Sequence, residues 1–179
     1  MRLQQVERSS VTGNAIANSA GTGLSMEDCN RVIADANQIT WAGAHGITAV
    51  TCTQMTISSN QVVFPDNNGI LIQGGSDIQV RSNFIKGPGR VTNNAFYAVR
   101  LSTSASSVAL SGNKTRPYGS GNEAKYGLSI TSTCSLVQRY GNDWRGSQWT
   151  GGDAPTAGAG NGINDEGSSS ANTTATDLN

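Results

Sequence analysis

Cationic and aromatic side chains concentrate in the second half of this chain, between residues 81 and 126. The group consists of Arg81, Lys86, Arg90, Tyr97, Arg100, Lys114, Arg116, Tyr118, Lys125 and Tyr126. Cations attract carboxylates or phosphates, and aromatic faces stack on sugar rings or bases. The mixture therefore predicts a surface that binds a polyanion.

The distribution of charge points the same way, although the formal net charge of the 179 residues is zero. Residues 1–80 contain three basic and six acidic side chains, whereas residues 81–145 contain nine basic and two acidic ones. Two alternatives stay open. The cations could simply keep long loops soluble, with Trp144 and Trp149 closing the end of the core. Nucleic acid is another polyanion, but no recognisable nucleic-acid motif supports it.

Catalytic residues cannot be assigned from these patterns. Glycoside hydrolysis needs two carboxyl groups about 5 to 9.5 Å apart, and the acids of this chain do not fall into paired positions. The single histidine, His45, and the lack of a Cys-x-x-Cys pair argue against a metal site, and we expect no cofactor. We interpret His45 as an exposed turn residue, and we favour a chain without enzymatic activity of its own.

An internal repeat must position these side chains. Asn recurs every 23 residues and then after steps of 30 and 29, at Asn14, Asn37, Asn60, Asn83, Asn113 and Asn142. A Gly-apolar pair keeps the same period, as in Gly46-Ile47 and Gly69-Ile70, and alternating apolar and polar residues follow it. Such alternation is the period of a β-strand, and self-similarity at about 20 to 50 residues is typical of a solenoid.

Aligning the chain on the Asn residues predicts which side chains face inward. Three positions before Asn lie Val11, Ala34, Ile57, Val80 and Leu110. Five positions before lie Val32, Met55, Ile78, Val108 and Val137, and two positions after lie Ile16, Ile39, Val62, Ile85, Thr115 and Trp144. We therefore expect an all-β fold, a single-stranded right-handed parallel β-helix of about six coils over residues 1–149. The Asn carboxamides should stack as a structural ladder at a turn whose left-handed backbone the Asn residues adopt.

The regularity breaks between Ile85 and Val99 and again between Thr115 and Leu128, where two consecutive coils gain about six residues each. Insertions of this kind map to loops on one face of a solenoid, often the binding face. The predicted polyanion site therefore lies on coils four to six.

The repeat length, the Asn turn and the Gly-apolar marker resemble those of right-handed parallel β-helix proteins of the pectin-lyase-like group, which includes polysaccharide lyases, glycoside hydrolases and bacteriophage tailspikes. The resemblance covers about residues 3–145 and implies an acidic polysaccharide as the ligand. It also implies two alternatives, a non-catalytic spike or spacer and a lyase that acts on uronate glycans by β-elimination. For the lyase, the candidate cations are Arg81, Arg100, Lys114 and Arg116. The aspartate cluster that binds calcium in pectate-lyase-like enzymes has no visible counterpart here.

The ends of the chain carry separate expectations. The repeat begins almost at once, without a capping helix, which predicts the C-terminal segment of a longer surface or virion protein; stacking on another chain through the open first coil, or a homotrimer, is the alternative. No apolar run could span a membrane and no signal peptide is present, so an extracellular location would depend on a longer exported protein. Residues 150–179, rich in Gly, Ser, Ala and Thr, are expected to form a mobile tail or linker.

The three cysteines, Cys29, Cys52 and Cys134, each lie eight residues before an Asn of the repeat. We expect three buried thiols in one inward column. A disulfide between Cys29 and Cys52 is the alternative.

Overall fold

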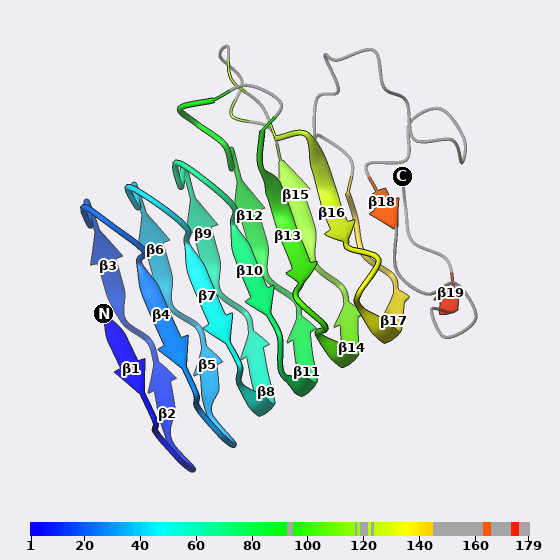
Figure 1. Ribbon diagram of the computed structural model, residues 1–179. Helices are drawn as coiled ribbons and strands as arrows, with labels where there is room; N and C mark the ends of the chain where they lie inside the picture. The colour runs from blue at the N-terminus through cyan, green and yellow to red at the C-terminus, as the bar shows by residue number, and fades with distance from the viewer. Residues whose placement is uncertain are drawn as a thin grey trace.

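The computed structural model describes residues 1–92, 95–116, 118, 122 and 124–144, together with the backbone of two short strands at 163–165 and 173–175. The strands form three parallel sheets that run along the whole stack (Figure 1). Sheet A contains β1 (Arg2–Gln4), β4 (Leu24–Glu27), β7 (Ile47–Val50), β10 (Ile70–Gln73), β13 (Tyr97–Ser102), β16 (Tyr126–Ile130) and β18 (Ile163–Asp165). Sheet B contains β2 (Ser10–Thr12), β5 (Ile33–Asp35), β8 (Thr53–Ser58), β11 (Ser76–Arg81), β14 (Ser106–Ser111), β17 (Ser135–Tyr140) and β19 (Thr173–Ala175). Sheet C contains β3 (Ala15–Ala17), β6 (Gln38–Thr40), β9 (Gln61–Val63), β12 (Phe84–Lys86) and β15 (Lys114–Arg116).

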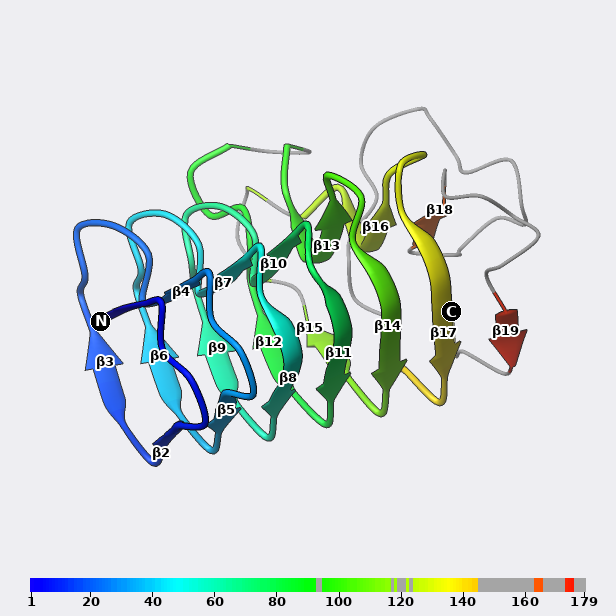
Figure 2. The same ribbon diagram turned by 60° about the horizontal axis from the view of Figure 1, so that its bottom comes forward.

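The chain passes through sheets A, B and C in turn and then returns to sheet A one rung further along (Figure 2). The register steps by 23 residues where Ile47 lies beside Ile70, and by 29 where Ile70 lies beside Val99. Because parallel in-register strands place equivalent side chains one above another, each repeat position becomes a column. This arrangement confirms the predicted parallel β-helix.

Each coil bends at residues whose φ is positive. In the third coil these are Thr51, Gln54, Ser59 and Phe64, with φ between 50° and 58°. The expectation that the ladder Asn residues would themselves be left-handed is wrong. The residue before each Asn takes the positive φ instead, so that the Asn side chain can point inward from the start of the next strand.

The predicted inward columns form one continuous apolar core. The residues three and five positions before Asn are buried, as are those two positions after it from Ile39 onward. Leu3, Val6 and Ile16 of the first coil are only partly buried. At the other end Trp144, 1% exposed, takes the position two residues after Asn142 and belongs to the same core.

The Asn ladder is confirmed in its hydrogen bonds. Asn60 shows the pattern: its Oδ1 accepts the backbone N–H of Asn37 at 2.9 Å and the Asn37 Nδ2 at 3.0 Å. Its own Nδ2 donates to Asn83 Oδ1 at 3.0 Å and to the Ala34 carbonyl at 2.9 Å. These four bonds satisfy the whole carboxamide, which is why a polar side chain is stable in a buried column.

The cysteines are free thiols, as the first interpretation predicted, and the Cys29–Cys52 disulfide is not formed. All three are buried. Cys29 Sγ contacts the Glu27 carbonyl oxygen at 3.3 Å and Cys52 Sγ contacts that of Val50 at 3.3 Å, so the thiols point the same way on successive coils. Burial, with a smaller contribution from Cys29, raises the pKa of Cys52 to about 11, which keeps this thiol protonated and unreactive at neutral pH.

The sixth coil contains β16 and β17, and Asp143 forms an isolated parallel bridge to Lys114 in place of a third strand. Two segments of the expected tail, β18 and β19, pair with β16 and β17 and so continue sheets A and B. The remaining residues of 145–179, including Trp149, lie outside the described residues. Within the described part of the chain, no helix is long and apolar enough to cross a membrane.

Candidate functional site

The candidate site lies where the chain leaves sheet C and enters sheet A. The connection there spans residues 18–23, 41–46 and 64–69 in the three short coils, and lengthens to 87–96 and 117–125 in the two irregular coils. We call this row of connections the loop edge. Figure 1 shows the described part of the connection between β12 and β13 extending beyond the shorter connections at the top of the stack.

Aromatic rings of three coils meet on the sheet C side of the loop edge. Trp41 and Phe64 have ring centroids 5.0 Å apart, and Phe64 meets Tyr118 edge to face at 4.7 Å. Lys86 Nζ lies 5.5 Å from the centroid of Phe64, and the guanidinium of Arg90 lies 5.1 Å from that of Trp41. Trp41 remains 41% exposed, so this ring still offers surface to a ligand. We call these five residues the Trp41 cluster.

The first long loop is held in place beside this cluster. Arg90 forms an ion pair with Asp66 of the preceding coil. Two further hydrogen bonds support the contact, because the Gly89 backbone N–H donates to the Asn67 carbonyl at 2.8 Å and the Asn122 side-chain Nδ2 donates to the Arg90 carbonyl at 2.9 Å. Arg90 therefore serves in part to anchor its loop, and Asp66 neutralises its charge.

A second group lies on the sheet A side of the loop edge. Tyr97 and Tyr126 stack with ring centroids 6.0 Å apart and planes 2° from parallel. The Arg100 guanidinium lies 5.2 Å from the Tyr97 centroid, and Lys125 Nζ lies 5.6 Å from that of Tyr126. We call these four residues the Tyr97 cluster.

His45 lies next to the Tyr97 cluster and is partly buried, which corrects its interpretation as an exposed turn residue. Its Nδ1 accepts the backbone N–H of Asn68 at 3.2 Å. Burial, and after it the positive charge of Arg100, lowers the pKa of His45 below its ordinary value. The imidazole is therefore neutral at pH 7, and its Nδ1 is not available as a general base while this bond is kept.

The ten predicted ligand-binding residues occupy all three sheets. Lys86, Arg90, Tyr97, Arg100, Tyr118, Lys125 and Tyr126 belong to the loop edge or border it, Lys86 as the last residue of β12. Lys86, Lys114 and Arg116 lie in outward columns of sheet C, and Arg81 lies on the outer face of sheet B. The four candidate lyase cations are thus divided among sheets A, B and C and do not converge on one sugar.

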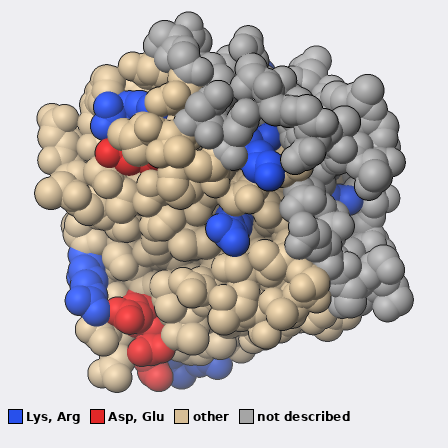
Figure 3. Space-filling view, turned by 45° about the horizontal axis from the view of Figure 1, so that its top comes forward, with Lys and Arg blue, Asp and Glu red and all other residues tan. Residues whose placement is uncertain are grey.

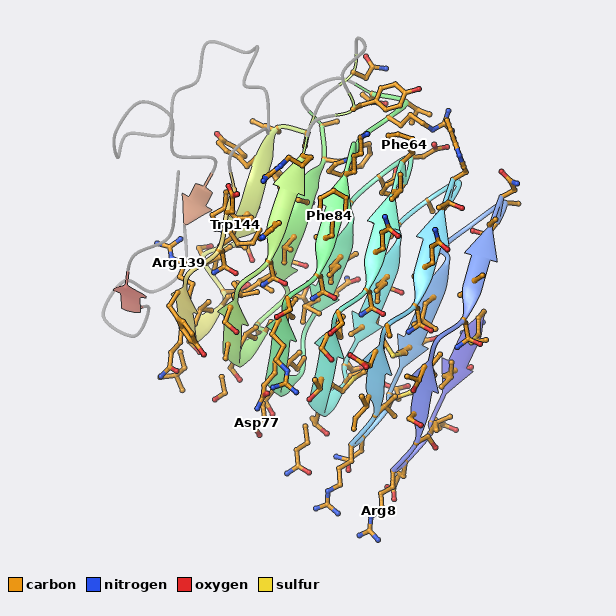
Figure 4. The ribbon with its side chains drawn as sticks, turned by 180° about the vertical axis from the view of Figure 1, so that it is seen from behind. Arg8, Phe64, Asp77, Phe84, Arg139 and Trp144 are labelled. Atoms are coloured by element: carbon orange, nitrogen blue, oxygen red, sulfur yellow. The ribbon has the colours of Figure 1, made fainter. Side chains whose placement is uncertain are left out.

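Sheet C carries a smaller basic face of its own. Its outward columns hold small, neutral or apolar residues in the first three coils, and then change to Phe84 beside Lys114 and Lys86 beside Arg116. Figure 4 shows Phe84 on β12, with Phe64 nearer the loop edge. Arg116 is paired with Asp143 at 3.0 Å, and the Asp143 side chain is largely buried, so this cation helps to fix the last coil.

Charges on the face seen in Figure 3 form separate small groups rather than one continuous patch. Among the described residues, no three His, Cys, Asp or Glu side chains are grouped as a metal site would require. Lys86, Arg100 and Lys125 form no ion pair with a described carboxylate. Arg81 and Lys114, which are exposed and lie outside the loop edge, form none either. At the loop edge, Lys86, Arg100 and Lys125 are therefore the cations whose charge no described carboxylate balances.

Comparison with known proteins settles the family. The profile described as "Right handed beta helix region" matches residues 1–143. The chain belongs to this family. The repeat length, the Asn turn and the Gly-apolar marker are therefore features of a right-handed β-helix. The right-handed coil that parallel crossovers predict is also the coil of this family.

Two solved structures are similar to this β-helix in fold. Full-length tailspike protein 2 of an Escherichia coli O157:H7 bacteriophage superposes with a TM-score of 0.69 at 17% identity, covering 88% of this chain and 23% of the tailspike. The enzymatically active domain of the bacteriophage CBA120 tailspike protein 2 gives a TM-score of 0.66 at 17% identity, covering 88% of this chain and 25% of that one. The chain thus spans about a quarter of these tailspike chains. No curated protein matches it in sequence.

Sequence reasoning missed Trp41, Phe64 and Asn68, and it misjudged His45. A signal for them was present in the repeat. Trp41 and Phe64 both stand four residues after a ladder Asn, and His45 and Asn68 both directly precede the Gly of the marker pair. Residues that occupy the same repeat position in neighbouring coils become neighbours in space.

Proposed function

We propose that this right-handed β-helix binds an acidic polysaccharide along its loop edge. The observation that carries the proposal is the placement of four cations, Lys86, Arg90, Arg100 and Lys125, over four aromatic rings along this edge. A chain of acidic sugars presents alternating apolar ring faces and carboxylates, and such a surface offers partners for both.

The charge of the loop edge supports an anionic ligand. Arg90 is neutralised by Asp66, whereas Lys86, Arg100 and Lys125 have no carboxylate partner in the described part of the chain. The direction of the stack also suits a polymer, because the two clusters together involve successive coils about 4.8 Å apart. A linear glycan could therefore contact several coils at once.

The tailspike likeness supports, by fold only, a place in a larger surface or virion assembly. Association of three copies is a related prediction, which light scattering of the purified protein checks. A mass of one chain at micromolar concentration would contradict it.

The test of binding is gel retardation in polygalacturonate, with a charge-matched control. The variant Lys86→Ala, Arg100→Ala, Lys125→Ala removes three positive charges at the loop edge. The control, Arg8→Ala, Arg31→Ala, Arg81→Ala, removes three charges away from it; Figure 4 shows Arg8 at the opposite edge from Phe64. We expect the first variant to bind about tenfold to hundredfold more weakly at low salt, and the control to stay near the parent protein.

Equal retardation of both triple variants would refute the loop edge as the binding surface. No retardation of the parent protein by several acidic glycans would favour a spike or spacer. The same incubations are read for ultraviolet absorbance of an unsaturated uronate product, which would reveal a lyase.

A further inference from the structure

A hollow lies on the outer face of sheet B, between β14 and β17. It has a volume of about 250 Å³ and is lined by Ser107, Val108, Ala109, Leu136 and Gln138. The two strands pair in register along this stretch, and Figure 2 shows them as neighbours. Leu136 shares its repeat position with Arg8 and Asp77. Figure 4 shows these two at the edge of the stack opposite Phe64, so the hollow is separate from the loop edge.

Leu136 forms the apolar wall of this hollow. Six residues before Asn, the earlier coils carry polar or charged side chains, namely Arg8, Arg31, Gln54, Asp77 and Ser107. Leu136 takes that position in the sixth coil and is 54% exposed. Tyr140, four residues further along β17, is 55% exposed. Two large apolar side chains on one strand thus remain open to contact with a ligand.

Polar groups stand beside the apolar wall. The hydroxyl of Ser107 and the carboxamide of Gln138 bond to no side chain or backbone group in the described part of the chain. A hydroxyl can both donate and accept, and a carboxamide offers two donors and one acceptor. The hollow therefore combines apolar surface with hydrogen-bonding groups, as a site for an amphipathic ligand requires.

The hollow carries no charge of its own. Residues 101–113 and 126–138, which contain the lining residues, include no Asp, Glu, Lys or Arg. On the neighbouring β11, Asp77 and Arg81 have opposite charges. Arg139 follows Gln138 but takes the inward position that Leu110 holds in β14. These surroundings favour an uncharged ligand over an ion.

We propose that this hollow binds one uncharged pyranose ring. The C–H face of the ring would pack on the side chains of Leu136 and Ala109, and its hydroxyls would exchange hydrogen bonds with Ser107 and Gln138. Pockets for drug-sized ligands have volumes of about 300–1,000 Å³, so the smaller volume here suits a single ring. The inference goes beyond the proposed function, because both the edge of the molecule and the charge of the ligand differ.

The test is a titration followed by amide-detected NMR, with the methyl glycosides of glucose, galactose and mannose as neutral probes. We expect at least one of them to shift the amide resonances of the lining residues in a saturable way. The dissociation constant should be on the order of millimolar, as for other ligands of this size. No saturable shift at these residues with any of the three, up to about 100 mM, would overturn the proposal.

Two further probes test the class of ligand. Glucuronate adds a negative charge to the ring, and cyclohexanol keeps a six-membered ring with a single hydroxyl. We expect both to bind at least about threefold more weakly than the best glycoside. A smaller difference for glucuronate would overturn the uncharged assignment, and a smaller difference for cyclohexanol would overturn the sugar in favour of an apolar partner.

Ala109→Leu tests the hollow by filling it. We expect this variant to bind the best glycoside at least about tenfold more weakly. Ala15→Leu is the matched control, because it makes the same change at an exposed position of sheet C and should keep the parent affinity. An unchanged affinity in Ala109→Leu, or an equal loss in Ala15→Leu, would count against the hollow as the site.

Leu136→Gly tests the apolar wall without endangering the fold. Leu136 has a φ of 53°, which glycine adopts more readily, so the melting temperature should stay the same or rise. Glycoside affinity should nevertheless fall about threefold to tenfold, because the apolar wall is lost. Parent-like affinity in this folded variant would contradict the site.

The two proposals can fail separately. The loop-edge variant Lys86→Ala, Arg100→Ala, Lys125→Ala should keep the glycoside shifts, and a loss of them would contradict binding in the hollow. If a glycoside binds there but no acidic polymer is retarded, the proposed function fails and the hollow stands as a sugar site. If polygalacturonate is retarded at the loop edge but no glycoside binds, the hollow fails and the proposed function stands.

Discussion

The two ends of sheet C behave differently. At its start, the Asn corner repeats the same hydrogen bonds from Asn14 to Asn142, whether the coil is short or long. At its end, the loop edge changes from coil to coil in length, in charge and in aromatic content. One edge of the β-helix is therefore uniform and buried, and the other is variable and open.

With the proposed function, this difference separates the residues that stabilise the fold from those that would bind the glycan. The Asn corner satisfies its polar groups internally, so a change there exposes or strands buried donors and acceptors. The loop edge leaves cations without a described carboxylate partner and the Trp41 ring 41% exposed. Substitutions in the two regions should accordingly differ in what they affect, and the following predictions test that distinction.

The largest effect is expected from Asn60→Ala within the ladder. The change removes four hydrogen bonds, leaves the Asn37 Nδ2 without its Asn60 acceptor, and leaves Asn83 Oδ1 with only the backbone N–H of residue 60 on that side. We expect a loss of about 3–5 kcal/mol in the free energy of unfolding, measured in urea. The control is Asn14→Ala, at the partly exposed end of the ladder, which should cost less than half as much; equal losses would mean that the ladder does not act through burial.

Gly46 is the last residue of the 41–46 connection, and its surroundings leave no room for a side chain. A Cβ added at Gly46 would lie 2.2 Å from Val62 Cγ1 and 2.6 Å from the Gly69 carbonyl oxygen, so Gly46→Ala should destabilise by about 2–4 kcal/mol. Gly13→Ala is the matched control, because a Cβ there meets nothing within 4 Å and only the left-handed φ of 68° disfavours it. Its expected cost is about 1 kcal/mol. A smaller loss for Gly46→Ala than for Gly13→Ala would contradict close packing at this point.

The exposed ring of Trp41 should matter for binding and not for folding. We expect Trp41→Ala to weaken polygalacturonate retardation about fivefold to thirtyfold, because a stacked aromatic ring contributes about 1–2 kcal/mol. The unfolding midpoint should change little. Trp144→Ala is the opposite case, since this ring is in the core and its loss should lower stability first.

A buried hydroxyl offers a stabilising change. Thr115 Oγ1 is buried without a hydrogen-bond partner in the described part of the chain, in a column that otherwise holds Ile, Val or Trp. Thr115→Val keeps the shape and removes the unsatisfied group, so stability should rise by about 1 kcal/mol in urea denaturation. A decrease of that size would indicate that the hydroxyl has a partner after all.

The smallest effect concerns His45 and pH. Because the folded-state pKa of His45 is lowered, the unfolded chain binds the proton more readily than the folded one. As the pH falls from about 6.5 towards the folded-state pKa of His45, protonation of the unfolded chain lowers the free energy of unfolding. Well above pH 6.5 the imidazole is neutral in both states, and His45 adds no pH dependence. Melting temperatures at about pH 7.5 and 5.5 should fall more in the parent protein than in His45→Asn, and parallel curves would rule out this linkage.

The repeat made most of the fold predictable. A column such as Val11, Ala34, Ile57, Val80 and Leu110 is visible in the sequence because stacking imposes the same size and polarity on each coil. The ladder followed from the same spacing. The backbone detail was less accessible, since residues as different as Thr51, Gln54 and Phe64 share a positive φ that their types do not favour.

The candidate site was predictable only in part. The cations were found by composition, but composition could not separate Arg81 on sheet B from Arg100 on sheet A. Trp41 was overlooked and His45 was misjudged because both precede the basic segment in the chain, although stacking brings them to it. Their partners come from later coils, and only the register of the sheets reveals them.

The conserved register across the long coils has a practical consequence. Although residues 87–96 form a longer connection than 64–69, β13 still pairs with β10 residue for residue over Ile70 to Gln73. The frame thus accommodates additional peptide at this point without a shift in the strand register. Foreign segments could be grafted into the 41–46 or 64–69 connection to give the same scaffold a new binding specificity.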